Sequence, residues 1–134
     1  MLVDTSVLSE LPRPRPNAQV LGWFAAQQAI HVSVVTIEEL AYGVARAAAS
    51  ARTRLARWFD ALLDSRPVIL DVTPSIARAS GDLRAARESR GRRVAQADML
   101  IAATALVHGL TLVTRNGRDF EGCGVTVFDP FAGT

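Results

Sequence analysis

Residues 96–113 combine an apolar helix with a strand that follows it almost immediately. The apolar stretch that begins at Met99 is long enough for a helix, Gly109 is a typical helix end, and the short run up to Val113 is typical of a strand. Helix and strand in such close succession favour an α/β fold, in which helices cover a parallel sheet. One acid, Asp98, stands at the entrance of this apolar helix. Its charge either favours the positive end of the helix dipole or points into a polar cleft.

The same alternation of strands and helices runs along the whole chain. Strands are expected at residues 1–3, 30–35, 67–72, 112–114 and 125–128, and the longer helices at about 17–28, from 36 into the alanine-rich segment, 51–64, 73–89 and 96–108. A chain of 134 residues has room for one such domain. We therefore expect a single α/β domain over residues 1–134, a three-layer α/β/α arrangement around a parallel sheet of four to five strands.

The composition excludes several functions. All 15 basic residues are arginine, so the chain has no P-loop lysine, Schiff-base lysine or phospho-receiver lysine. The single cysteine, Cys123, cannot form an internal disulfide. No apolar run reaches the roughly 18 residues that a membrane span requires. We expect a cytoplasmic protein without membrane contact.

Four acidic residues are expected near the carboxyl ends of the parallel strands, where open α/β sheets bind ligands. Asp4 follows the first strand, Glu39 begins the helix after the second, Asp98 opens the helix before the fourth, and Asp119 lies in the turn after it. Each acid also has a structural explanation. Asp4 can cap a helix, Glu39 can complete a capping box with Thr36, Asp98 can serve the helix dipole, and Asp119 can be a solvated turn residue.

Taken together, these acids point to a metal site. Carboxylates crowded in one cleft repel one another, and a cation offsets that repulsion. Oxygen ligands without a cysteine or histidine partner favour Mg²⁺ or Mn²⁺ over zinc. Such a metal orients and activates a water and stabilises charge on phosphate oxygens, while the hydroxyls of Thr5, Ser6 and Thr114 can hold the ligands. The pattern therefore indicates phosphoryl chemistry.

Four segments of the chain carry a resemblance to a known family. They are residues 1–10 (MLVDTSVLSE), 34–43 (VVTIEELAYG), 97–105 (ADMLIAATA) and 114–120 (TRNGRDF). In this order and at these spacings they resemble the motifs of PIN-domain ribonucleases. The likeness is greatest to the VapC-type toxins of bacterial toxin–antitoxin pairs, including the FitB-like branch, and it spans nearly the whole chain.

The resemblance implies a PIN fold and a Mg²⁺- or Mn²⁺-dependent endoribonuclease that acts as a toxin. It also implies a homodimer and a cognate antitoxin of the VapB or FitA type that occludes the site. By position, Asp4, Glu39 and Asp98 look like the three central catalytic and metal-binding acids, and Asp119 looks like the more variable fourth.

Two details of the motif match concern neighbouring residues. Glu39 is preferred to Glu38 because it precedes Leu40 in a Glu-Leu-x-x-Gly pattern. The resemblance also places Thr114 and Asn116 near metal-bound water or substrate.

Arginines offer a route by which an acidic site attracts RNA. Five of them precede Asp98 and can make a positive rim, although they can equally form a solvated helix face; they are Arg84, Arg87, Arg90, Arg92 and Arg93. Arg115 and Arg118 flank the fourth acid and can hold a phosphate through two hydrogen bonds each.

The sequence leaves two other functions open. The first is a catalytically idle RNA-binding or scaffold domain that keeps its acids for helix capping. The second is a phosphatase or phosphotransfer domain, which is disfavoured by the missing lysine and by the lack of a second aspartate two residues after Asp4. Trp23, Trp58 and Phe59 belong to the core or line a groove for a partner helix.

Overall fold

The computed structural model describes residues 1–133, which form five strands, six α-helices and one 3₁₀ helix. The strands are β1 (Leu2–Val3), β2 (His31–Ser33), β3 (Val68–Leu70), β4 (Leu112–Val113) and β5 (Val127–Phe128). All pairs are parallel, in the order β3-β2-β1-β4-β5. The predicted parallel sheet of four to five strands is confirmed.

Helices alternate with these strands along the chain. They are α1 (Thr5–Leu8), α2 (Ala18–Ala25), α3 (Val34–Ala45), α4 (Ala49–Asp64), α5 (Pro74–Glu88), α6 (Gln96–His108) and the 3₁₀ helix η1 (Gly117–Phe120). Within residues 1–133, none of them is both long enough and apolar enough to cross a membrane.

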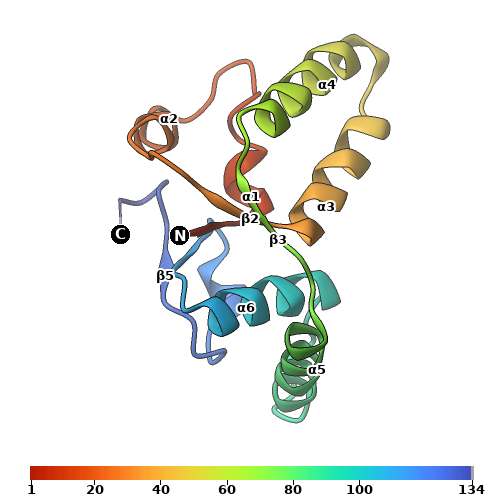
Figure 1. Cartoon of the computed structure of the whole chain (residues 1–134), viewed down its shortest axis with the longest axis vertical. Helices are drawn as coiled ribbons and strands as arrows, with labels where there is room; N and C mark the ends of the chain where they lie inside the picture. Colours follow the sequence, from red (N-terminus) through yellow and green to blue (C-terminus); the bar gives the residue numbers. More distant parts are fainter. Residues whose placement is uncertain (134) are drawn as a thin grey trace.

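Helices cover both faces of the sheet because successive strand residues point to opposite faces. Leu2 and its register partner Leu112 pack with buried residues of α6, whereas Val3 and Val113, one position later, pack with buried residues of α1 to α4. Figure 1 shows α1 to α4 on one side of the sheet and α5 and α6 on the other. The predicted three-layer arrangement is confirmed.

Several helix ends follow the predicted chemistry. The Asn17 side chain accepts hydrogen bonds from the backbone nitrogens of Gln19 and Val20 at 2.9 and 3.1 Å and so caps α2. Thr73 caps α5 by accepting from the backbone nitrogen of Ile76 at 3.2 Å. Gly109 ends α6 in the left-handed conformation, with φ of 63°.

The predicted capping box of Thr36 and Glu39 is wrong. The second strand ends at Ser33, and α3 begins at Val34, because the Ser33 hydroxyl accepts a hydrogen bond from the backbone nitrogen of Val35 at 3.0 Å and caps the helix there. Thr36 therefore lies inside the helix, fully buried. Glu39 is left without a capping role.

Two glycine substitutions test whether Gly109 ends α6 as a left-handed cap. Gly109→Ala should lower the free energy of unfolding by about 1 kcal/mol, because alanine is strained at a positive φ. Gly81→Ala, inside α5 with no atom within 4 Å of the added Cβ, should raise it by up to about 1 kcal/mol. Urea unfolding measures both. Equal effects of the two substitutions would contradict the assignment of Gly109 as a left-handed cap.

Candidate active site

Asp4 lies at the centre of the sheet edge on which the predicted site residues gather. It follows β1, which pairs with β2 on one side and β4 on the other. Its side chain is buried and makes no helix-capping bond. Instead its Oδ2 accepts hydrogen bonds from the hydroxyls of Ser6 at 2.8 Å and Thr114 at 2.7 Å. Capping therefore does not explain this carboxylate, which two hydroxyl groups hold in place.

Glu39 comes to the same edge from α3. The hydroxyl of Thr5 donates a hydrogen bond to its Oε1 at 2.7 Å and lies 3.1 Å from the hydroxyl of Thr36. Thr5 thus connects the start of α1 to α3. Glu38, one residue earlier, is exposed to solvent. The structure places Glu39, rather than Glu38, with the other acids.

Asp98 occupies the first turn of α6, which packs against α3, α5 and η1. Burial and, to a smaller extent, the charges of Asp4, Asp119 and Glu39 together raise the pKa of its carboxyl group from 3.8 to about 6. Proximity to a helix N-terminus does not keep this pKa low. Asp4, Glu39 and Asp119 therefore each lie within electrostatic reach of Asp98.

Asp119 is the most exposed of the four acids and lies in η1. It shares a hollow of about 240 Å³ with Asp98 and with three arginines. Its position at the solvent-exposed rim differs from that of Asp4, which is buried. The structure therefore separates inner acids held by hydroxyls from an outer acid in contact with solvent.

These acids suit a hydrated cation better than a closed metal cage. Within residues 1–133, no three histidine, cysteine, aspartate or glutamate side chains already converge as ligands of one ion. Mg²⁺ usually keeps several waters and takes one or two carboxylates, so it does not need such convergence. The hydroxyl bonds of Asp4 fall on Oδ2 and that of Glu39 on Oε1, which leaves the second oxygen of each carboxylate for other ligands. The donors fit Mg²⁺ or Mn²⁺ and not tetrahedral zinc.

The residues after β4 support this edge mainly through their backbone. The backbone nitrogen of Asn116 donates to the Thr114 hydroxyl at 3.0 Å, and that of Arg115 donates to the Ser6 hydroxyl at 3.2 Å. The Arg115 guanidinium lies 4.4 Å from the centre of the Phe131 ring. Arg115 and Asn116 line a hollow of about 330 Å³ together with Ser6 and Glu10.

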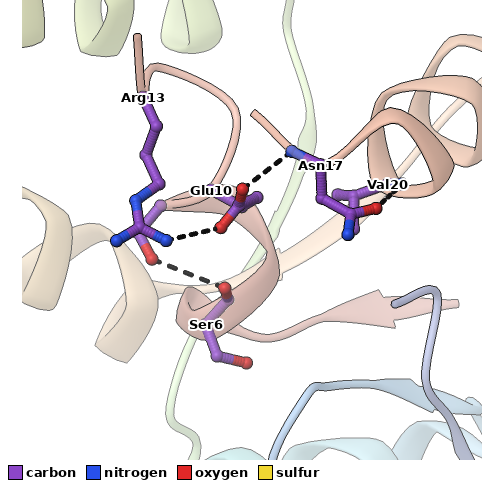
Figure 2. A network of polar contacts seen from close by, with 6 residues as sticks. Ser6, Glu10, Arg13, Asn17 and Val20 are labelled. Atoms are coloured by element: carbon purple, nitrogen blue, oxygen red, sulfur yellow. Dashed lines mark hydrogen bonds and ion pairs between the residues drawn. The ribbon is translucent and has the colours of Figure 1, made fainter. Parts of the chain in front are cut away.

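Glu10 is a buried acid that the sequence did not single out. Figure 2 shows it between Arg13 and Asn17; its Oε1 lies 3.0 Å from the Arg13 guanidinium, and its Oε2 accepts from the backbone nitrogen of Asn17 at 2.8 Å. Burial tends to raise the pKa of this carboxyl group, but these two bonds, together with the charges of Arg13 and Arg115, outweigh burial and hold the pKa below its usual range. Glu10 thereby fastens the proline-rich segment 12–16 to the end of α1.

The arginines before Asp98 do not behave as one group. Arg84, Arg90, Arg92 and Arg93 are exposed, as a solvated face predicts. Arg87 is buried, with only 5% of its surface exposed. The sequence pattern gave no sign of this difference.

Of the two expectations for the aromatic residues, core or groove, the structure shows the core for all three. Trp23, Trp58 and Phe59 all pack partly buried against the core between the sheet and α1 to α4, and the Trp23 ring lies 6.2 Å from the Phe128 ring at a tilt of 36°. Trp58 also lines a hollow of about 220 Å³ that includes Thr5 and Glu39. An apolar hollow thus reaches the acidic edge.

Comparison with known proteins shows the family of this chain. A model of the PIN domain matches residues 1–123, and the chain belongs to the PIN-domain family. The VapC ribonuclease Y4jK of Sinorhizobium fredii is 33% identical over 98% of this chain and 97% of that protein. Toxin FitB of Neisseria gonorrhoeae is 33% identical over 98% of both. The crystal structure of FitAcB from Neisseria gonorrhoeae matches with a TM-score of 0.81 at 32% identity, over 97% of both chains.

Removal of one charge from the cluster should stabilise the metal-free protein. Because the pKa of Asp98 is raised from 3.8 to about 6, the native state binds this proton more tightly than the unfolded state. Ionisation of Asp98 therefore costs native stability as the pH rises through this window. Asp98→Asn should raise the free energy of unfolding by about 1 kcal/mol at neutral pH, a value reduced from the full shift because the side chain is partly solvated.

Urea unfolding in EDTA, repeated from about pH 4 to about pH 7, measures this effect. The gain of Asp98→Asn over the wild type should grow between pH 3.8 and about 6 and then level off. Asp82→Asn, at an exposed acid of α5, is the control and should show no such growth. A destabilised Asp98→Asn protein would contradict the repulsion.

Proposed function

We propose that this protein is a metal-dependent endoribonuclease that hydrolyses RNA phosphodiester bonds in the cytoplasm as the toxin of a toxin–antitoxin pair. The observation that carries the proposal is that acids from three other segments, Asp4, Glu39 and Asp119, lie close enough to Asp98 for their charges to add to the effect of burial on its pKa. Family membership supports it, as do the ribonuclease and the toxin among the relatives, which match this chain over 98% of its length. The catalytic unit is a single PIN domain over residues 1–134.

Asp4, Glu39 and Asp98 would hold Mg²⁺ or Mn²⁺, with Asp119 at the outer side. PIN ribonucleases generally depend on a divalent metal, and here the crowded carboxylates give the reason, because a cation removes their repulsion. When bound, the metal supplies an activated water and stabilises negative charge on the phosphate.

The rest of the chain orients these ligands. Ser6 and Thr114 hold one oxygen of Asp4, and Thr5 holds one oxygen of Glu39, so each carboxylate presents its other oxygen in a defined direction. Arg115 and Asn116 line a polar hollow beside Ser6, where an RNA strand can lie.

A cognate antitoxin of the VapB or FitA type would bind next to the acids, and the toxin would act as a homodimer. The apolar hollow lined by Leu40, Val44, Leu55 and Trp58 opens beside Glu39 and suits an apolar segment of such a partner. A bound segment there would block access to Glu39.

The alternative of an idle RNA-binding or scaffold domain rests on a capping role for the acids. Asp4 makes no capping bond, and Glu39 belongs to no capping box. Both instead accept hydroxyl hydrogen bonds that fix their orientation. The geometry favours an active site over helix capping.

A pair of neighbouring glutamates gives a matched test of the nuclease. Glu39→Gln should lower the rate of RNA cleavage in Mg²⁺ or Mn²⁺ by at least about 100-fold, because one metal ligand loses its charge. Glu38→Gln, at the exposed neighbour, should stay within about 2-fold of the wild type. Cleavage of a mixed RNA pool, read by sequencing of the fragment ends, measures both rates. EDTA should abolish the wild-type activity; cleavage that survives EDTA or Glu39→Gln would contradict the proposal.

A further inference from the structure

Arg87 is a buried cation without a counter-charge in contact. It lies near the end of α5 with 5% of its surface exposed. Its Nε has no hydrogen-bond partner among the described residues. None of the ion pairs within residues 1–133 includes it, although arginine is rarely fully buried unless it is paired. This arrangement leaves a site for an external anion.

The backbone around Arg87 leaves room for its guanidinium. Its Nη1 lies 3.4 Å from the point where a Cβ on Gly122 would stand, and Gly122 has a φ of 79°. Cys123, the next residue, is also buried against Met99. The guanidinium is therefore enclosed on the side of the loop after η1, and Arg87 also lines the hollow next to Asp98.

That hollow joins two kinds of charge. About 240 Å³ in volume, it is lined by three arginines and by two of the acids; these residues are Arg87, Arg92, Arg93, Asp98 and Asp119. Arg92 is held in place, because it donates to the Arg118 carbonyl at 3.2 Å and lies 3.6 Å from Glu121. A ligand that fits this hollow must bring negative charge to the arginines and at the same time reach the proposed metal ligands.

We propose that Arg87 anchors a phosphate subsite next to the metal site, and that this subsite takes the RNA phosphate adjacent to the one that is cleaved. The inference rests on the proposed ribonuclease function. A single RNA strand carries one phosphate per nucleotide, so it can present one to the metal and the next to the arginines. The planar guanidinium, with several donors, matches phosphate oxygens in pairs.

The competing explanation is that Arg87 serves only as an internal counter-charge for Asp98 and Asp119. No carboxylate within residues 1–133 lies within 4.0 Å of its guanidinium, so this role would act at longer range. Charge alone would then matter, and lysine should replace arginine without loss. A phosphate subsite requires the fork of donors, so lysine should replace arginine only in part.

Binding of a fluorescent single-stranded RNA in EDTA tests the subsite without cleavage. Arg87→Gln should weaken binding by about 10-fold and lower the salt dependence of log K by about 0.7, the value for one phosphate contact on a single strand. Arg87→Lys should weaken RNA binding by about 3-fold, because lysine keeps the charge but not the fork of donors. The control Arg90→Gln, at an exposed arginine three positions along outside this hollow, should lose less than about 2-fold. Inorganic phosphate should compete with the RNA in the wild type and not in Arg87→Gln.

Several outcomes would overturn the subsite. Equal losses of RNA affinity in Arg87→Gln and Arg90→Gln would mean that Arg87 contributes only to the overall positive charge. Full binding by Arg87→Lys would leave only the counter-charge role. Thermal unfolding checks that each variant is folded, and if Arg87→Gln does not fold, the partial loss in Arg87→Lys carries the test, with full binding again the overturning result.

A modified RNA locates the contact. In an oligonucleotide whose cleavage site has been mapped, a methylphosphonate at the neighbouring linkage removes one phosphate charge. It should slow the wild type by about 10-fold and should not slow Arg87→Gln further, because the two changes remove the same interaction. Additive losses would overturn the subsite even if the protein is a ribonuclease. Conversely, if RNA binding depends on Arg87 but the protein cleaves no RNA, the proposed nuclease function is contradicted and the phosphate contact is still supported.

Discussion

Repulsion among carboxylates at one edge of a parallel sheet is the constraint on which this structure depends. Asp4 sits at the end of the central strand, and α3, α6 and η1 bring Glu39, Asp98 and Asp119 to it from the two sides. Burial of Asp98 and, in second place, the charges of the other acids raise its pKa, so an ionised Asp98 lowers the stability of the metal-free protein. Two hydrophobic cores, one on each face of the sheet, offset this cost.

Two different kinds of support surround the acids. Asp4 and Glu39 are held by hydroxyls of Ser6, Thr114 and Thr5, which fix the direction of the carboxylates without neutralising them. Asp98 and Asp119 instead line a hollow together with arginines. Hydroxyl donors keep a carboxylate available to a cation, whereas arginines at a distance attract an anion. The two sides of the site therefore suit the two charges of a metal-bound phosphate.

The sequence predicted the parts of the structure that depend on local chemistry. Asn17, Thr73 and Gly109 cap or end helices through interactions with residues a few positions away, so their roles can be deduced from the chain alone. The four acids could also be brought together, because parallel strands place their carboxyl ends at one edge. The capping box at Thr36 failed because Ser33, buried at the end of β2, provides an equally good cap three residues earlier.

The burial of Arg87 among exposed arginines could not be predicted from the sequence, for a different reason. Arg84, Arg87 and Arg90 recur every three residues and look alike in the chain. Packing of α5 against α6, together with the loop at Gly122, encloses only the second of them. The contacts that distinguish Arg87 come from more than thirty residues away. They form only when the sheet brings the loop after β4 beside α5.

An acidic nuclease site must attract a polyanion, and the distribution of arginines explains how this protein can do so. Its formal net charge is only +2, so overall charge supplies little attraction. Exposed arginines can be screened by salt, whereas a buried guanidinium is screened much less and needs little reorganisation to meet a phosphate. A cation placed beside the acids also lowers the repulsion that an incoming strand meets there. Specific placement of one arginine can therefore replace a large basic surface.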